Sequence, residues 1–378
     1  MSQRKITRFK VTAATAAALA LVSLSACSKT GQSSSSGTAG AADPKDLVLV
    51  ASVINTTNPY MASMIQGAQA LGKKLNIPVQ IIDSQNSSQT EISKIQAVLA
   101  QGKKVVLMVN TVASSDAPTI VNAVKAAGGY VTVWWNKPDS LEPWNVGNNF
   151  VAFQKYSGVE SGVCTAKGLA ESLGGKGNIV GLAGVLDSTT SQTRVAGLKE
   201  GLKAYPNIKL LDVQPANWDP QQGLTVTQNL LTKYPGQING IWAADDGMII
   251  GASEAAKKAG VYNATKFASD GLYPEVISLM KEPNTPVVAE TFHRGFMASA
   301  IGLYTAYLAA TGKIDPSTLP HEKRDSLFKL VCVTPQNYTE VTKFDDTIDS
   351  WIDTLIQKGP WDTDPTPLVG GGPEKLPS

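Results

Sequence analysis

The chain has 378 residues, which at about 100–200 residues per domain predicts two domains, or at most three. Hydrophobic residues make up 43% and charged residues 17%, so wholesale disorder is excluded and a large core is possible. Lys and Arg number 33 against 31 Asp and Glu. This balance, a formal charge of +2, excludes a nucleic-acid binder that depends on a strong basic field.

Residues 1–26 have the pattern of a secretory signal, with four basic residues and then an apolar run over 11–22. The run is too short to span a membrane comfortably, since about 20 apolar residues are needed. Leu24-Ser25-Ala26-Cys27 is similar to a bacterial lipobox, in which Cys27 is lipidated. An ordinary signal with an incidental cysteine is the alternative. Residues 27–45, rich in Ser, Gly and Ala, predict a flexible tether that holds the protein outside the cell membrane.

Two further cysteines, Cys164 and Cys332, form an even pair in an oxidising compartment. A disulfide between them is one expectation and two buried free thiols are the other. The sequence does not decide between them, because it does not give the distance between their Cα atoms.

After the tether, short runs rich in Val, Ile and Leu alternate with longer runs whose apolar residues recur three and four positions apart. The expected strands of the first half are 46–54, 79–83, 105–110 and 130–135. The helices expected between them are 59–75, 87–101 and 117–127. This alternation predicts a parallel sheet covered by helices.

The alternation stops at 137–149, a segment with two prolines that is expected to cross to a second unit. The strands expected after it are 178–183, 208–213, 238–243, 266–269, 287–291 and 327–333. The expected helices are 153–173, 189–204, 220–234, 248–259, 274–281, 296–311 and 346–357. A Pro/Gly-rich tail follows and is expected to be loose.

These patterns predict an α/β fold with two doubly wound parallel-sheet lobes joined by a multi-strand hinge. The first lobe is expected to hold 46–147 with 291–326, and the second 148–290 with 327–345, which leaves 346–378 as a C-terminal helix and tail. Ligands bind beyond the carboxyl ends of strands in such sheets, so both lobes are expected to face one cleft that closes by hinge motion.

The expected strand ends carry side chains suited to a ligand with many hydroxyl groups. Carboxylates and amides match hydroxyls, and aromatic rings cover C–H faces. The candidate ligand-binding residues are Asn58, Tyr60, Asn110, Trp135, Asn136, Gln192, Trp218, Asp245, Asp270 and Glu290, with Met61, Arg194 and His293 as weaker candidates.

Several of these residues have a structural alternative. Asp246 suits the N-cap of the next helix, and Arg194, which lies within a helix, suits an ion pair with a nearby acid. Met61 is as easily a core residue, and His293 a buried polar group. Trp134 and Trp135 are adjacent on a strand and should point to opposite faces, with Trp135 toward the ligand.

Three stretches, Asn58-Pro59-Tyr60, 244–248 and Ser269-Asp270-Gly271, occur in an order and spacing that, with others over 46–311, resemble the ribose-type sugar-binding receptors of ABC importers. These are type I periplasmic binding proteins. The resemblance implies a receptor that closes on one small carbohydrate and delivers it to an ABC permease.

In such a receptor, Tyr60 and Trp218 would be the aromatic walls. The resemblance also assigns sugar contacts to a further set, namely Asn110, Asp245, Asp270 and Glu290.

The chain departs from the family pattern at three positions. Trp135-Asn136 stands where Asp-Arg is common, Gln192 aligns with a ligand-binding Arg, and Met61 replaces an aromatic residue. Two cationic side chains are therefore missing from the expected site. This favours a neutral ligand, a monosaccharide or a polyol, held by carboxylates and amides between Trp and Tyr rings.

Rival functions are weaker. The chain has no Gly-x-Ser-x-Gly elbow, no dinucleotide fingerprint and only two histidines, so we expect no enzyme, no cofactor and no metal. A sugar-responsive repressor would carry a DNA-binding helix pair in place of the signal. We expect the protein to be a monomer. A receptor that presents its closed form to a membrane sensor, in chemotaxis or signalling, is the alternative to transport.

Overall fold

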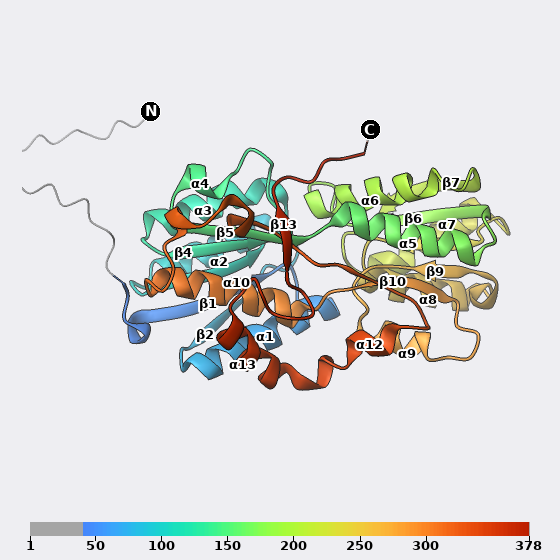
Figure 1. The fold of residues 1–378 in the computed structure, drawn as a ribbon. Coiled ribbons are helices and arrows are strands. Elements are labelled where there is room, and N and C mark those ends of the chain that lie inside the picture. The colour runs from blue at the N-terminus through green and yellow to red at the C-terminus, as the bar shows by residue number, and fades with distance from the viewer. Residues whose placement is uncertain (1–40, 378) are drawn as a thin grey trace, which may run out of the picture. The chain divides into compact units, whose positions relative to one another are not determined.

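The computed structural model describes residues 41–377. Within them, two parallel-dominated sheets are each covered by helices and form two α/β lobes (Figure 1). This confirms the expected fold class. The signal, the lipobox with Cys27 and residues 28–40 of the tether lie outside the described residues.

The first lobe contains a seven-stranded sheet in the order β13-β11-β5-β4-β3-β1-β2. Its strands are β1 (Leu47–Val53), β2 (Val79–Asp83), β3 (Lys104–Asn110), β4 (Tyr130–Trp134), β5 (Phe150–Tyr156), β11 (Asp325–Phe328) and β13 (Leu368–Gly371). Only the edge strand β13 runs antiparallel to its neighbour. Strand β1 is buried on both faces, which explains its continuous apolar run.

Helices cover both faces of this sheet. Helices α1 (Pro59–Leu75) and α10 (Gly295–Ala310) cover one face with α13 (Ile348–Lys358), and α2 (Ser88–Leu99) and α3 (Ala117–Ala126) cover the other. The short helices α4 (Pro143–Val146) and α11 (His321–Arg324) lie in connections. Helices α1 and α10 touch closely at Gly67, where a Cβ would lie 2.1 Å from the Phe296 carbonyl oxygen.

The second lobe contains a six-stranded sheet in the order β12-β10-β9-β8-β6-β7. Its strands are β6 (Lys176–Ala183), β7 (Asn207–Pro215), β8 (Gly240–Ala243), β9 (Lys266–Ala268), β10 (Val287–Phe292) and the antiparallel edge strand β12 (Val331–Val333). Its helices are α5 (Gly158–Ser172), α6 (Thr189–Leu202), α7 (Pro220–Lys233), α8 (Asp246–Lys258) and α9 (Pro274–Met280). The short α12 (Tyr338–Thr342) follows β12.

The expected boundary between the lobes is wrong. Residues 150–156, expected within the second lobe and partly as helix, form β5 of the first sheet because Phe150, Ala152 and Phe153 fill a buried central strand. The chain therefore crosses at Ser157, between β5 and α5, and 137–149 stays in the first lobe.

Two C-terminal expectations are also wrong. The single strand expected over 327–333 is divided, with β11 in the first sheet and β12 in the second, so the chain crosses between them. The tail is not loose over its described length, because β13 pairs with β11 from Ser326 to Phe328. Together with the crossings after β5 and after β10, this gives three connections at the hinge.

Candidate ligand-binding site

A small cavity lies where the carboxyl ends of both sheets meet. The first lobe contributes Ile54, Tyr60, Met61, Asn110, Trp135 and Asn136, and the second lobe and the hinge contribute Thr190, Arg194, Trp218, Asp245, Tyr273 and His293. All twelve residues are buried. The cavity is therefore enclosed, and the lobes are described in a closed arrangement.

Four of the twelve wall residues are Tyr or Trp. Tyr60 and Tyr273 stack with ring centroids 6.0 Å apart, and Trp135 meets Tyr60 edge-on at 6.0 Å. The Arg194 guanidinium lies 4.9 Å from the Trp135 ring centroid and 6.0 Å from that of Trp218. Such rings suit the C–H faces of a ligand.

The backbone is unusual at the two tryptophans that line the cavity. Trp135 and Trp218 have φ angles of 69° and 61°, in the left-handed region that bulky residues rarely adopt. Strand β4 ends at Trp134, so the expected alternation of faces does not reach Trp135. The two adjacent indoles belong to the same core cluster, 6.1 Å apart, yet only Trp135 lines the cavity. The expected ligand-facing tryptophan is the one that reaches the cavity, but for a different reason.

Asp270 lies behind the wall and does not line the cavity. Its carboxylate pairs with Arg194 Nη2 at 2.7 Å, accepts from Thr291 Oγ1 at 2.6 Å, and contacts His293 Nε2 and the Ser161 hydroxyl. Burial opposes ionisation, but the Arg194 charge and these hydrogen bonds hold the pKa of Asp270 well below its usual range.

Burial lowers the pKa of His293, which favours the neutral ring although Asp270 acts against this. A carboxylate only accepts hydrogen bonds, so His293 Nε2 donates to Asp270 and Nδ1 keeps a lone pair. Arg194 also donates from Nη1 to the Ala244 carbonyl oxygen at 2.6 Å. The ion pair expected for Arg194 is present, and the residue lines the cavity as well.

Asp245, not Asp246, caps helix α8, because its Oδ1 accepts from the Met248 amide. Its Oδ2 accepts from Asn58 Nδ2 at 2.8 Å and from the Tyr273 hydroxyl at 2.9 Å. Burial raises the pKa of Asp245. Asn58 is absent from the cavity wall; it caps α1 and joins the two lobes through Asp245 and the Trp218 carbonyl oxygen.

Besides Asn58 and Asp270, two more expected ligand residues do not line the cavity. Glu290 is fully buried behind the cavity, where its Oε1 and Asp246 Oδ1 both lie 2.5 Å from the Ser269 hydroxyl. Gln192 is exposed on α6 and donates to the Leu186 carbonyl oxygen. Sequence position placed both after strands, but it could not show that one side chain points under the sheet and the other along the surface.

Further contacts close the lobes over the cavity. Asn136 Oδ1 accepts from the Ser188 hydroxyl at 2.8 Å, and the Thr190 hydroxyl donates to the Trp135 carbonyl oxygen at 2.8 Å. At the rim, the Ser114 amide donates to the Asp187 carbonyl oxygen at 2.8 Å. Asn110 and Asn136 both line the cavity, as expected, and Asn136 also joins the lobes.

Sequence reasoning missed three wall residues, Ile54, Thr190 and Tyr273. Tyr273 had a usable signal, since it is an aromatic residue three positions after Asp270 in a strand-end loop. Ile54 and Thr190 had no comparable signal in the sequence.

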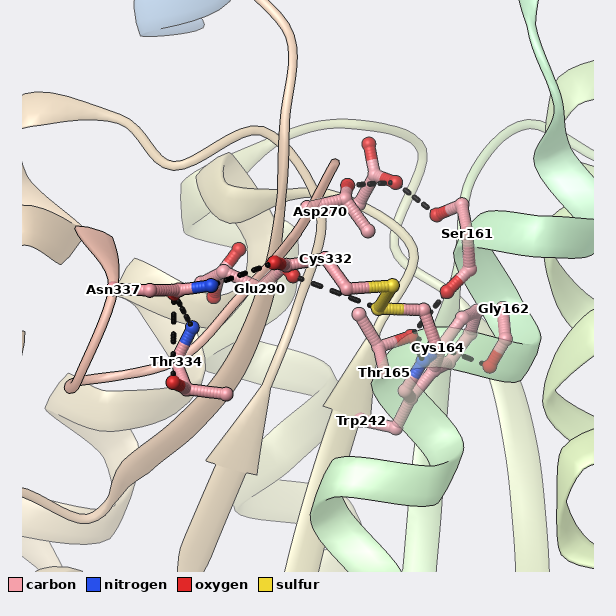
Figure 2. Close-up of a disulfide and its surroundings, with 11 residues drawn as sticks. Ser161, Gly162, Cys164, Thr165, Trp242, Asp270, Glu290, Cys332, Thr334 and Asn337 are labelled. Atoms are coloured by element: carbon pink, nitrogen blue, oxygen red, sulfur yellow. Dashed lines mark hydrogen bonds between the residues drawn. A yellow bond between two sulfur atoms is a disulfide. The ribbon is translucent and has the colours of Figure 1, made fainter. Parts of the chain in front are cut away.

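Cys164 of α5 and Cys332 of β12 form a disulfide, with Cα atoms 6.0 Å apart (Figure 2). The expected pairing is therefore present, within the second lobe. Among residues 41–377, no group of His, Cys, Asp or Glu is arranged to hold a metal ion, and no helix is long and apolar enough to cross a bilayer.

Comparisons with known proteins agree with this architecture. The model of the periplasmic binding protein domain matches residues 49–313. The ribose import binding protein of Escherichia coli is 29% identical over 226 residues, which cover 60% of this chain and 72% of that protein. A xylitol-binding protein of Mycolicibacterium smegmatis is 28% identical over 55% of this chain and 57% of its own length.

Solved structures show the same fold. A Burkholderia phytofirmans structure, described as a twin-arginine translocation pathway signal protein, has a TM-score of 0.80 and 32% identity, over 87% of this chain and 99% of that one. The Caulobacter myo-inositol binding protein has a TM-score of 0.69 and 24% identity, over 82% of this chain and 100% of its own. The relatives named for ribose, xylitol and myo-inositol are binding proteins rather than enzymes. Together with the two-lobed fold and the enclosed cavity, the family match shows that the chain belongs to the periplasmic binding proteins, an extracytoplasmic family.

Proposed function

We propose that this protein is an extracytoplasmic receptor that binds a small neutral carbohydrate, a monosaccharide or polyol, and delivers it to an ABC-type permease. It works as a monomer and without a cofactor. Relatives named for ribose and xylitol support this ligand class. The proposal depends most on the unpaired polar atoms of the cavity.

Within residues 41–377, four buried atoms of cavity-lining residues have no hydrogen-bond partner, namely the Tyr60 hydroxyl, Trp218 Nε1, Arg194 Nε and His293 Nδ1. A buried unpaired group costs about 1–3 kcal/mol, so a ligand that pairs with all four gains strongly. Trp218 Nε1 and Arg194 Nε are donors, His293 Nδ1 is an acceptor, and the Tyr60 hydroxyl can act as either. Neighbouring hydroxyls of one sugar satisfy both kinds.

Charge near the cavity favours a neutral ligand. The Arg194 charge is already matched by Asp270 at 2.7 Å. The Asp245 carboxylate is occupied by Asn58, Tyr273 and Met248. An anionic ligand would lose its hydration without gaining a free cation, and a cationic ligand would find the Asp245 oxygens already taken by hydrogen-bond donors. Amide, indole and guanidinium groups thus take the place of the carboxylate contacts expected from sequence.

The lipid anchor is a separate part of the proposal and depends on Leu24-Ser25-Ala26-Cys27 alone. We expect the wild-type chain to incorporate labelled palmitate in a bacterial host and to remain with the membrane fraction. Cys27→Ser should lose the label. A labelled Cys27→Ser variant would contradict the anchor without affecting the ligand proposal.

The ligand is tested by calorimetry with a panel of ribose, allose, xylitol and myo-inositol, with glucuronate and glucosamine as charged counterparts. We expect one or more neutral compounds to bind. At 100 times its dissociation constant, a ligand adds about 2.7 kcal/mol to stability, which thermal unfolding detects. A clear preference for glucuronate or glucosamine, or no binding by any neutral compound, would overturn the proposed ligand class.

Trp218→Phe tests the observation directly, since it removes the indole donor and keeps an aromatic ring. Loss of one neutral hydrogen bond of about 1 kcal/mol should weaken binding about fivefold. Trp144→Phe is the matched control, because Trp144 stacks on His321 outside the cavity. Equal affinities in the two variants would show that Trp218 Nε1 does not bind the ligand.

A further inference from the structure

The chain after β12 forms connections between the lobes beyond the three at the hinge. It leaves the second sheet at Val333, packs on the first lobe as α13, and joins the first sheet as β13. Its last residues then reach α6 of the second lobe, where Leu376 and Pro377 line a surface hollow. We call residues 334–377 the C-terminal strap.

The beginning of the strap is fixed to the second lobe. The Cys164–Cys332 disulfide ties β12 to α5 (Figure 2). Asn337 donates to the Cys332 carbonyl oxygen at 3.2 Å, and its Oδ1 accepts from the Thr334 amide at 2.7 Å. The first residues of the strap therefore move with β12.

The middle of the strap is fixed to the first lobe. Trp351, Ile352 and Leu355 of α13 are buried in the core shared with α1 and α10. Between α12 and α13, Asp345 accepts from Arg294 Nε at 2.5 Å and from Nη2 at 2.8 Å. Arg294, at the hinge, also donates to the Gly271 carbonyl oxygen in the second lobe.

The end of the strap returns to the hinge. Lys155 Nζ donates to the Gly372 carbonyl oxygen at 3.0 Å. The Glu374 carboxylate then accepts from the Gly158 and Val159 amides at 3.1 and 3.0 Å and from the Ser157 hydroxyl. A carboxylate at the first turn of α5 is stabilised by the free amides and the helix dipole.

We propose that the C-terminal strap stabilises the closed arrangement of the lobes before any ligand binds. Its two ends hold the second lobe and the hinge while its middle holds the first lobe. Opening must therefore break or rearrange the contacts of Asp345 or Glu374. The strap goes beyond the proposed ligand function and does not depend on which ligand fills the cavity.

Hydrogen exchange of the ligand-free protein tests the strap. Three amides donate between the lobes and report closure, namely Ser114 to the Asp187 carbonyl oxygen, Thr189 to Ser114 Oγ, and Thr190 to Asn136 Oδ1. We expect them to be protected in the wild type. Glu374→Gln, Asp345→Ala and removal of 373–378 should each speed their exchange about fivefold or more, as expected for the loss of one charge-assisted bond.

Glu340→Gln is the control, because Glu340 is exposed on α12 and the same charge is removed. It should match the wild type, and the amides of β1 and β3 should stay protected in every variant. If the truncation exposes β1 and β3, the two point variants decide. Unprotected closure amides in the wild type, or unchanged exchange in both point variants, would overturn the proposal.

Discussion

The two lobes bring different chemistry to the same cavity. The first lobe contributes only neutral side chains, with Tyr60, Trp135 and two asparagines among them. The second lobe and the hinge contribute Arg194, Asp245 and His293, backed by Asp270. The Arg194 and Asp270 charges are therefore paired within the second lobe itself.

This difference separates two tasks. The charged network of the second lobe fixes the direction of a few donors and acceptors, because Asp270 pairs with Arg194 and Asp245 accepts from Tyr273. The first lobe supplies rings and contacts such as Asn58 to Asp245, which exist only when the lobes are closed. Variants in the second lobe should damage the fold and the site, whereas variants in the first should mainly alter closure.

The largest effect is expected for Asp270→Asn, which removes the charge that faces Arg194. Breaking one side of a buried ion pair costs about 3–5 kcal/mol, because the remaining charge is left uncompensated. Urea unfolding should show a loss of this size, and affinity for any neutral ligand should fall at least about tenfold.

Asp353→Asn is the control, because Asp353 forms an exposed ion pair with Lys74 in the first lobe. An exposed pair contributes about 0–1 kcal/mol. If Asp270→Asn costs no more than this control, the second lobe does not depend on a compensated charge network.

A smaller effect is expected for Asn58→Ala, which removes the cap of α1 and the bond to Asp245. Loss of a cap costs about 1 kcal/mol and up to about 2, measured by urea unfolding. Asp219→Ala removes the cap of α7, whose carboxylate accepts from the Gln222 amide of its own helix. Only Asn58→Ala should also speed exchange at the Ser114 amide; equal exchange in the two variants would show that Asn58 does not support closure.

A further effect is a dependence of stability on pH. The Ser269 hydroxyl has one hydrogen for two carboxylates, so Asp246 and Glu290 need a shared proton. Burial raises the pKa of Asp246 to about 7 and that of Glu290 well above its usual range. An acid whose pKa is raised by folding stabilises the protein at low pH, and this stability is lost as pH rises from the unfolded pKa through the folded one.

Urea unfolding of the wild type should therefore show declining stability between pH 5 and pH 8. Glu290→Gln imitates the protonated acid and should decline less over the same range. Glu91, whose pKa is raised to about 7 by burial, contributes equally to both proteins and cancels in the difference. Equal slopes would mean that Asp246 and Glu290 do not share a proton.

Much of the fold follows from local patterns. Apolar runs and helix periodicity predicted most elements in both lobes, because parallel sheets bury their strands on both faces. The prediction for Phe150–Tyr156 was wrong because a buried strand and a buried helix have similar short apolar runs. The single strand expected near 325–333 was also wrong. Which sheet each half joins depends on the strand it pairs with, and the local sequence does not show that partner.

The sequence predicted which strand ends form the site, but not which side chains point into the cavity. Tyr60, Asn110, Trp135 and Trp218 reach the cavity as expected, while Asp270 and Glu290 lie behind it. Residue type and position place a carboxylate near a cavity. Whether it meets the ligand depends on the protein donors that reach it first.

A crystal structure of the protein with its best-binding neutral carbohydrate would test the central claim most directly. We predict ligand oxygens within about 3.2 Å of Trp218 Nε1, Arg194 Nε and His293 Nδ1, with Asp270 still paired to Arg194. A ligand seated outside this cavity, or bound mainly by an Asp270 carboxylate released from Arg194, would contradict the account.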